Sequence, residues 1–292
     1  MCGLDARWQQ GRRSKRDMGT HDSDMQHLLE QLKDTNEKQR FSAAQELGQQ
    51  GDARAVDGLT RALNDDNHKV KYAALSSLVK IGSTEAATPT IAALLDDLDS
   101  RLWKLITLDI GMRLRNGLFA MIERDNTEVA DLLTAALDRS DLSQLQRALI
   151  IRLIGRTGDP RLVETFIDML MIGDETLQGA AGEALGYIGD ARAVAPLMVV
   201  LEDADSAVRE IAINALARIG DTRAGTSILP LLESNDPWTR RAAAAALGQL
   251  GDRRAVRKLM HMLRDDEDQE VRQAADEALS RLIPADADTD GE

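Results

Sequence analysis

The chain has 292 residues and a formal net charge of −13 at pH 7, and 43% of its residues are hydrophobic although only 3% are aromatic. A core of Ala, Leu, Ile and Val is typical of closely packed helices and argues against an aromatic-rich β-sandwich or barrel. The acidic balance argues against a general nucleic-acid-binding protein, which needs a basic surface to displace counterions.

The two ends of the chain differ in composition from its middle. Residues 1–22 carry positive charge without the apolar segment of a secretory signal, and residues 284–292 (PADADTDGE) are acidic and polar. We expect both segments to be disordered. Because no apolar stretch is long enough to cross a bilayer, we expect no membrane association. The only cysteine, Cys2, allows no internal disulfide and indicates a reducing cytoplasm.

A Gly–Asp turn recurs along residues 23–283. The hexapeptide GDARAV stands at 51–56 and again at 189–194, and related hexapeptides stand at 158–163 (GDPRLV) and 251–256 (GDRRAV). The turn glycines are spaced 31 residues apart in two runs. The first run is Gly51 and Gly82, and the second is Gly158, Gly189, Gly220 and Gly251. A fixed period of this length indicates a solenoid of stacked supersecondary units.

Each unit contains two predicted helices, an A helix followed by a B helix. In residues 191–203 apolar side chains recur at helical spacing, and the next helix begins at Asp205, a good N-cap, and ends at Gly220, where a left-handed residue is favourable. Asp221 then caps the following A helix. The pattern predicts an all-α solenoid, or superhelix, of about eight helix pairs at 24–50, 53–81, 84–124, 127–157, 160–188, 191–219, 222–250 and 253–283.

The turn also carries an arginine two residues after its aspartate. These Asp–Arg pairs predict a structural ladder that joins neighbouring units through hydrogen bonds, and the absence of a phosphate-loop spacing makes an anion site the weaker interpretation. The ladder comprises Asp52, Arg54, Asp159, Arg161, Asp190, Arg192, Asp221, Arg223, Asp252 and Arg254. A second basic row near the start of the B helices comprises Arg40, Lys71, Arg147, Arg209, Arg240 and Arg272.

Acidic residues gather at the turns between the helices and on the A-helix side of the units. We expect them to solvate the outer, convex face and to cap helices, because their spacing is not that of a calcium-binding EF-hand. They are Asp65, Asp66, Asp96, Asp97, Asp203, Asp265, Asp266 and Asp268.

An irregular, longer unit at about 99–126 interrupts the array. It has no Gly–Asp closure, and Leu118, Phe119 and Ile122 predict an additional helix after Asn116–Gly117. Such a segment is either sequence drift or a functional insertion.

The variable positions of the B helices are predicted to line the concave face of the solenoid. Aromatic residues and arginine, which dominate protein-binding hot spots, recur at these positions in a chain with few aromatic residues. The predicted partner-binding surface consists of Phe41, Tyr72, Trp103, Tyr187, Trp238 and Arg241. The alternative interpretation is that the aromatic side chains fill gaps between Ala-rich helices.

Three segments resemble the short HEAT-like repeats of phycobilin lyases and their relatives. They are LQGAAGEALGYIGDARAVAPLM (177–198), VREIAINALARIGDTRAGTSIL (208–229) and TRRAAAAALGQLGDRRAVRKLM (239–260). The resemblance covers about residues 24–283 and implies a HEAT-like α-solenoid. The same repeat occurs in proteins of unrelated function. One activity that the resemblance implies is the attachment of linear tetrapyrroles to a partner protein.

No catalytic or metal-binding constellation accompanies the repeats. One branch of the HEAT-like family hydroxylates a lysine-derived residue with iron held by His–Glu pairs, and such pairs are missing because none of the four histidines precedes a glutamate. The histidines are His21, His27, His68 and His261. Cys2 lies in a segment predicted to be disordered and is a poor candidate nucleophile. We therefore expect no catalytic residue, metal or cofactor.

The leading hypothesis is a non-enzymatic scaffold or adaptor of the cytoplasm that binds another protein on its concave face. A phycobilin lyase-like subunit or chaperone, which would hold a tetrapyrrole, is the first alternative. Nucleic-acid binding is weaker, since the positive stripe of Arg147, Arg152 and Arg156 is local in an acidic chain.

Overall fold

The structure, a computed structural model, describes residues 22–96, 112–122, 126–202 and 205–283. These residues form α-helices and short 3-10 helices, and none of them lies in a strand. The chain divides into two compact units, Met1–Glu123 and Arg124–Glu292. The predicted all-α solenoid is confirmed, because helix pairs of similar length stack in each unit. The segments predicted to be disordered lie outside the described residues, except that Asp22 begins a helical stretch at 22–31.

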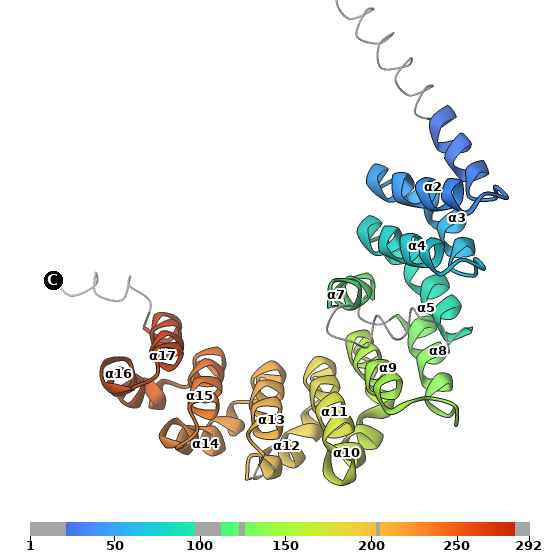
Figure 1. Cartoon of the computed structure of the whole chain (residues 1–292). Helices are drawn as coiled ribbons and strands as arrows, with labels where there is room; N and C mark the ends of the chain where they lie inside the picture. Colours follow the sequence, from blue (N-terminus) through green and yellow to red (C-terminus); the bar gives the residue numbers. More distant parts are fainter. Residues whose placement is uncertain (1–21, 97–111, 123–125, 203–204, 284–292) are drawn as a thin grey trace, which may run out of the picture. The chain divides into compact units, whose positions relative to one another are not determined.

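In the N-terminal unit, A and B elements alternate along the chain. The A elements after the first helix are η1 (Ala53–Ala55) with α3 (Val56–Ala62), and η2 (Thr84–Ala86) with α5 (Ala87–Asp96). The B helices are α2 (Glu37–Gln50) and α4 (His68–Ile81), and α7 (Met112–Met121) follows in the irregular unit. Helix α4 packs against both α2 and α7, so that the three follow one another in one layer (Figure 1).

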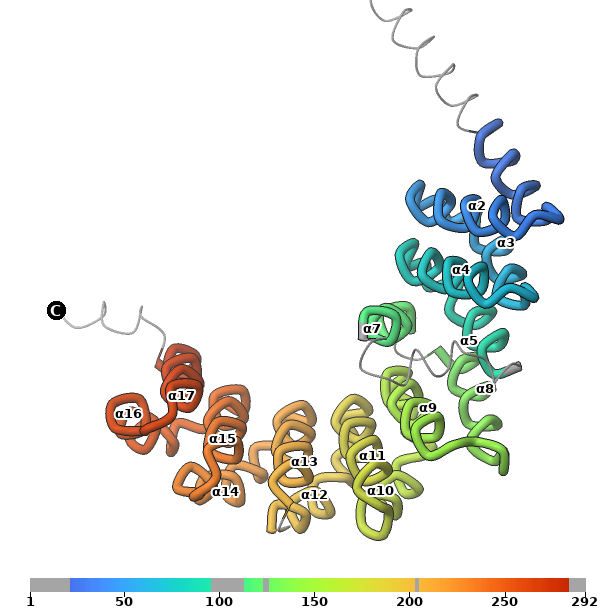
Figure 2. Tube along the Cα trace, viewed as in Figure 1, coloured from blue at the N-terminus to red at the C-terminus, as the bar shows by residue number. Residues whose placement is uncertain are grey.

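The C-terminal unit repeats the same two-layer arrangement more regularly. Its A layer contains α8 (Thr127–Leu137), η4 (Pro160–Leu162) with α10 (Val163–Ile172), η5 (Ala191–Ala193) with α12 (Val194–Val200), η6 (Thr222–Ala224) with α14 (Gly225–Ile228) and η7 (Leu229–Glu233), and η8 (Arg253–Ala255) with α16 (Val256–Asp265). Its B layer contains α9 (Gln144–Thr157), α11 (Glu175–Ile188), α13 (Ser206–Ile219), α15 (Pro237–Leu250) and α17 (Gln269–Leu282). Each B helix packs on the next B helix, as the row from α9 to α17 in Figure 2 shows.

The helices begin and end where the turn chemistry predicts. Asp205 caps α13 by accepting hydrogen bonds from the backbone N–H groups of Ala207 and Val208. Gly220 ends the helix with φ 78°, in the left-handed region that costs glycine nothing. Asp221 then accepts a hydrogen bond from the backbone N–H of Arg223 and opens the next A element. The predicted function of the Gly–Asp turn as a helix end followed by a helix start is confirmed.

Close approach of neighbouring B helices explains a second set of glycines. A Cβ atom on Gly186 would lie 2.8 Å from the backbone Cα of Ala215 on the next helix, and one on Gly155 would lie 2.5 Å from the Cα of Ala184. Both alanines are buried. A seam of Gly and Ala therefore sets the spacing of the B layer and leaves little room for larger side chains.

The prediction of a new helix after Asn116–Gly117 is wrong. Helix α7 runs without interruption from Met112 to Met121 through this dipeptide. The physical reason is packing, because a Cβ on Gly117 would collide with the side chain of Val79 on α4. Glycine is thus needed here for helix contact and not for a turn.

Candidate functional site

A groove of about 640 Å³ lies along the exposed side of α11, α13 and α15 in the C-terminal unit. Its polar lining consists of Glu183 and Tyr187 on α11, Glu210, Asn214 and Arg218 on α13, and Gln249 on α15. The 31-residue period places Tyr187, Arg218 and Gln249 at equivalent positions of successive helices. The groove is therefore a product of the repeat itself, with different side chains at the same register.

One end of the groove holds a stack of two guanidinium groups on one aromatic ring. The guanidinium carbon of Arg156 on α9 lies 4.5 Å from the centroid of the Tyr187 ring, and that of Arg218 on α13 lies 4.2 Å from it. Helices α9 and α13 pack on the two sides of α11, so that the arginines approach Tyr187 from both neighbours. Such cation–π contacts hold the guanidinium planes in place.

The remaining charged groups of the groove are paired. The Glu183 carboxylate accepts a hydrogen bond from Arg152 Nε at 2.9 Å. Glu210 and Glu270 both accept from Arg241, at 3.3 and 3.1 Å. Each of these acidic side chains thus has an arginine partner, although the single guanidinium of Arg241 serves two carboxylates.

The predicted partner-binding residues fall into two groups. Arg241 connects Trp238 to the groove, because its guanidinium carbon lies 4.7 Å from the Trp238 ring centroid while it binds the lining residue Glu210. Trp238 is 53% exposed. Tyr187 thus belongs to the lining of the groove, and Trp238 and Arg241 adjoin the groove at Glu210.

The other predicted residues do not join this group. Phe41 on α2 is half-buried and Tyr72 on α4 is 43% exposed, and both lie in the N-terminal unit. Trp103 lies outside the described residues. Of the six residues predicted to form one surface, three therefore lie in or next to the groove of the C-terminal unit.

The predicted ladder residues form a salt bridge within each turn. In one example, Arg192 donates from Nε to Asp190 Oδ1 at 3.1 Å and from Nη2 to Oδ2 at 2.8 Å. The corresponding pairs are Arg54–Asp52, Arg161–Asp159, Arg223–Asp221 and Arg254–Asp252. The contacts to the preceding unit are Arg54–Asp22, Arg161–Asp131, Arg192–Glu164 and Arg254–Thr226. Since these arginine side chains are about half exposed or more, each bond between units contributes little to stability.

The turn pairs change the titration of their aspartates. The Arg223 side chain, and then its backbone N–H, hold the pKa of the Asp221 carboxyl at about 2. Hydrogen bonds from the paired arginines likewise lower the pKa of Asp159, Asp190 and Asp252 below its ordinary value.

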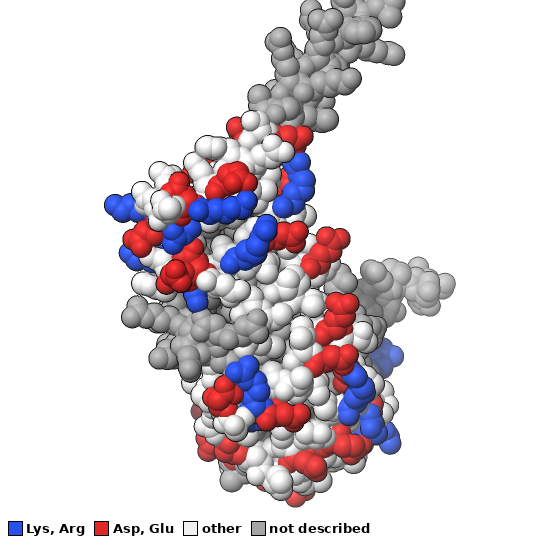
Figure 3. Space-filling model, turned by 90° about the vertical axis from the view of Figure 1, so that its right-hand side faces the viewer, with Lys and Arg blue, Asp and Glu red and all other residues white. Residues whose placement is uncertain are grey.

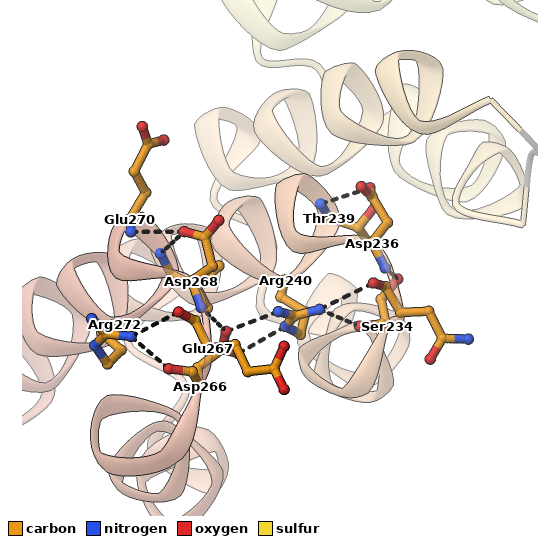
Figure 4. Close-up of polar contacts among 11 residues, drawn as sticks. Ser234, Asp236, Thr239, Arg240, Asp266, Glu267, Asp268, Glu270 and Arg272 are labelled. Atoms are coloured by element: carbon orange, nitrogen blue, oxygen red, sulfur yellow. Dashed lines mark hydrogen bonds and ion pairs between the residues drawn. The ribbon is translucent and has the colours of Figure 1, made fainter.

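Two aspartates expected to solvate the outer face instead form buried bonds between units. Arg240 binds Asp266, whose side chain is 9% exposed, and Figure 4 shows its guanidinium between Asp266 and the Ser234 carbonyl. Arg40 binds Asp65, whose side chain is 8% exposed, at 2.6 Å. The recurrence of an arginine 25 or 26 residues before an aspartate was a signal for these pairs, since Asp65 and Asp266 occupy equivalent turns.

Charge is mixed over the surface. On the face that Figure 3 draws, basic and acidic side chains lie next to one another, in keeping with the many Arg–Asp pairs. Among the described residues, no group of three or more His, Cys, Asp or Glu side chains is placed to hold a metal ion. In the same part of the chain, every helix is too short or too polar to cross a bilayer.

Comparison with known proteins places these features in a repeat family. The sequence matches the family model for HEAT repeats over residues 25–106, 129–201, 170–234 and 194–280. No curated protein matches it significantly.

Several solved structures are similar to this chain at low sequence identity. Human deoxyhypusine hydroxylase in complex with glycerol is 18% identical over 91% of this chain and 98% of its own, with a TM-score of 0.39. YibA of E. coli is 18% identical over 91% and 97% of the two chains, with a TM-score of 0.47. Kap121p is 15% identical over 88% of this chain and 33% of its own, with a TM-score of 0.46, so the chain spans about a third of its length.

Proposed function

We propose that this chain, which belongs to the HEAT-repeat family, is a non-enzymatic scaffold or adaptor that binds a partner protein in the groove across α11, α13 and α15. The groove is the observation that carries the proposal. Its lining combines an aromatic ring, an arginine side chain and uncharged amides, and the exposed Trp238 is connected to it through Arg241 and Glu210. Aromatic and arginine side chains are the residue types that contribute most to protein-binding energy.

The dimensions of the groove favour an extended segment of the partner. Neighbouring packed helices lie roughly 8–10 Å apart, so the three helices present equivalent positions over roughly 16–20 Å. An extended chain advances about 3.3 Å per residue, and about five or six residues would span that length. Asn214 and Gln249 offer both a donor and an acceptor to such a backbone.

A phycobilin lyase-like function is the more specific alternative. The three segments that resemble that repeat type favour it, and the Arg156 and Arg218 guanidiniums could receive the propionate groups of a linear tetrapyrrole. This function predicts visible absorbance on mixing with bilin, whereas an adaptor predicts none.

Affinity capture from native cell extract tests the leading proposal. Wild type and two single variants serve as baits, Asn214→Trp inside the groove and Val199→Trp on α12 in the opposite layer. Both positions are exposed, so neither indole has to enter the core. We expect Asn214→Trp to fill the groove and to lose a protein that wild type and Val199→Trp retain.

The opposite pattern would refute the site. Retention by Asn214→Trp and loss from Val199→Trp would place the partner on the A layer. A coloured ligand that copurifies and is lost from Asn214→Trp would support the tetrapyrrole alternative.

A further inference from the structure

Arg156 and Arg218 differ from the other arginines on the B helices around the groove. Arg152, Arg209, Arg240 and Arg241 each have a carboxylate within ion-pair distance, and Arg147 donates to the carbonyl oxygens of Leu137 and Arg139. Arg156 and Arg218 contact the Tyr187 ring instead, and among the described residues no carboxylate lies within 4.0 Å of either guanidinium. In a chain with a net charge of −13, two adjacent arginines without carboxylate partners need an explanation.

The local charge of the groove is the reverse of that of the chain. Its two lining glutamates, Glu183 and Glu210, pair with Arg152 and Arg241, and Arg241 also pairs with Glu270, so that with Arg156 and Arg218 four arginines face three carboxylates. Among the described residues, the charges of Arg156 and Arg218 have no carboxylate partner, which leaves the Tyr187 end of the groove with an excess of positive charge. A groove of this kind attracts an acidic ligand although the whole protein repels it.

The stack also prepares the guanidiniums for binding. Both guanidinium groups lie over the Tyr187 ring, and neither donates a hydrogen bond to another described residue, so their N–H donors are available for a ligand. An arginine that is already held by an aromatic ring loses less side-chain freedom when it binds a carboxylate. Bidentate pairing of arginine with a carboxylate supplies both energy and direction.

We propose that the Arg156–Tyr187–Arg218 stack is the receptor for carboxylate side chains, so that the groove selects an acidic segment of its partner protein. This inference rests on the proposed function and names the chemistry of the partner. The acidic side chains would lie at the Tyr187 end, and the backbone of the segment would continue toward Asn214 and Gln249.

Fluorescence anisotropy of the full chain with labelled peptides tests the selectivity. The probes are a fluorescein-labelled ten-residue peptide of alternating Glu and Ser and its Gln–Ser counterpart. We expect the Glu peptide to bind wild type, more weakly as salt increases, and the Gln peptide to bind at least about tenfold more weakly.

Two double variants with the same change in charge locate the binding. Arg156→Gln with Arg218→Gln should weaken binding of the Glu peptide by about tenfold or more, since two charge-assisted contacts are lost. The matched control is Arg253→Gln with Arg257→Gln, which are exposed on η8 and α16. The control should bind as wild type does. The single variant Arg218→Gln, at an exposed position, should show a smaller loss and serves if the double variant does not fold.

Equal binding of the Glu peptide by wild type and both doubles, or equal binding of the Glu and Gln peptides, would overturn the inference. No detectable binding of the Glu peptide to wild type would overturn it as well. The two proposals fail separately. If Asn214→Trp loses the cellular partner while the arginine substitutions leave peptide binding unchanged, the groove binds the partner but does not select acidic segments. If peptide binding needs the arginines while Asn214→Trp keeps the partner, the stack binds carboxylates but the groove does not hold the cellular partner.

Discussion

Arg240 on α15 donates two parallel hydrogen bonds to Asp266, which precedes α17: Nε to Oδ2 and Nη2 to Oδ1, both at 2.8 Å. Both side chains are largely buried, at 17% and 9% exposure. The Nη1 group binds the carbonyl oxygen of Ser234, so that one guanidinium links two turns and two repeat units (Figure 4). Arg40 makes the same set of contacts to Asp65 and to the Asp34 carbonyl in the N-terminal unit.

The substitution Asp266→Asn should destabilise the protein strongly. It keeps the shape of the side chain but leaves the buried Arg240 guanidinium without its carboxylate, at a cost of about 3 kcal/mol. The neighbouring Asp265→Asn is the control, because Asp265 pairs with Arg264 at the surface and contributes below about 1 kcal/mol. Urea unfolding followed by circular dichroism measures both. Equal losses of free energy would show that the Arg240–Asp266 pair is not a principal link between the units.

Gly186→Ala should also reduce the free energy of unfolding. The added Cβ would lie 2.8 Å from the backbone of Ala215, so that α11 would have to shift away from α13. This shift should cost about 1–3 kcal/mol. The cost exceeds the gain of up to about 1 kcal/mol that alanine brings in helix propensity. Gly179→Ala on the same helix is the control. Its Cβ would lie 3.2 Å from the end of the Ile211 side chain, which can move, and 3.9 Å from Arg152 Nη2, an ordinary contact. A melting temperature unchanged by Gly186→Ala and lowered by Gly179→Ala would contradict the seam of small residues.

The turn aspartates predict a loss of stability in acid. A carboxyl whose pKa is lower in the folded chain stabilises it above the ordinary pKa, and this contribution is lost as pH falls through the folded value. For Asp221 the window runs from the ordinary value of 3.8 down to about 2. The expected result is a falling melting temperature over this range in thermal unfolding monitored by circular dichroism.

Asp221→Asn isolates one member of this set, because asparagine retains the N-cap acceptor but not the charge. The difference in melting temperature between wild type and Asp221→Asn should shrink as pH decreases from about 4 to about 2. The control Asp276→Asn removes an exposed carboxyl of α17 that forms no ion pair with another described residue. A difference for Asp221→Asn that stays constant across this range would contradict the titration of the turn pair.

Trp238 should report the occupancy of the groove. It is 53% exposed beside Arg241, so a bound partner should cover the indole and shift its emission to shorter wavelength. Replacing Trp8 and Trp103 with Phe leaves Trp238 as the only tryptophan. The shift should appear when the Glu peptide is added at saturating concentration. Unchanged emission with bound peptide would mean that Trp238 lies outside the contact surface.

The regular part of the fold was predictable because a few residues determine it locally. Gly220 and Asp221 fix a helix end and the next helix start without reference to distant contacts, and their 31-residue recurrence predicts the stack. The error at Gly117 has the opposite origin. Gly117 is needed because Val79 of another helix packs against it. The sequence around a single glycine does not show whether that glycine forms a turn or a close helix contact.

The site was predictable only in part because side-chain pairing crosses the repeats. Position within a B helix identified Tyr187 and Trp238 as residues of the variable face. It did not show that Arg156 and Arg218 stack on the Tyr187 ring while Arg241 turns to Glu210. Arg156, Tyr187 and Arg218 share one register at 31-residue spacing, and comparing side chains along that register was the signal for the groove.

Site-specific photocrosslinking shows which surface of the protein contacts the partner. The photoreactive residue p-benzoylphenylalanine replaces Trp238 beside the groove or, as a control, Val199 on α12, and each protein is irradiated in native extract. We expect a protein that is crosslinked from position 238, is absent from position 199, and is lost when Asn214→Trp is added to the same chain. A crosslinked protein obtained from position 199 alone, or one from position 238 that Asn214→Trp leaves unchanged, would contradict a partner-binding groove on α11, α13 and α15.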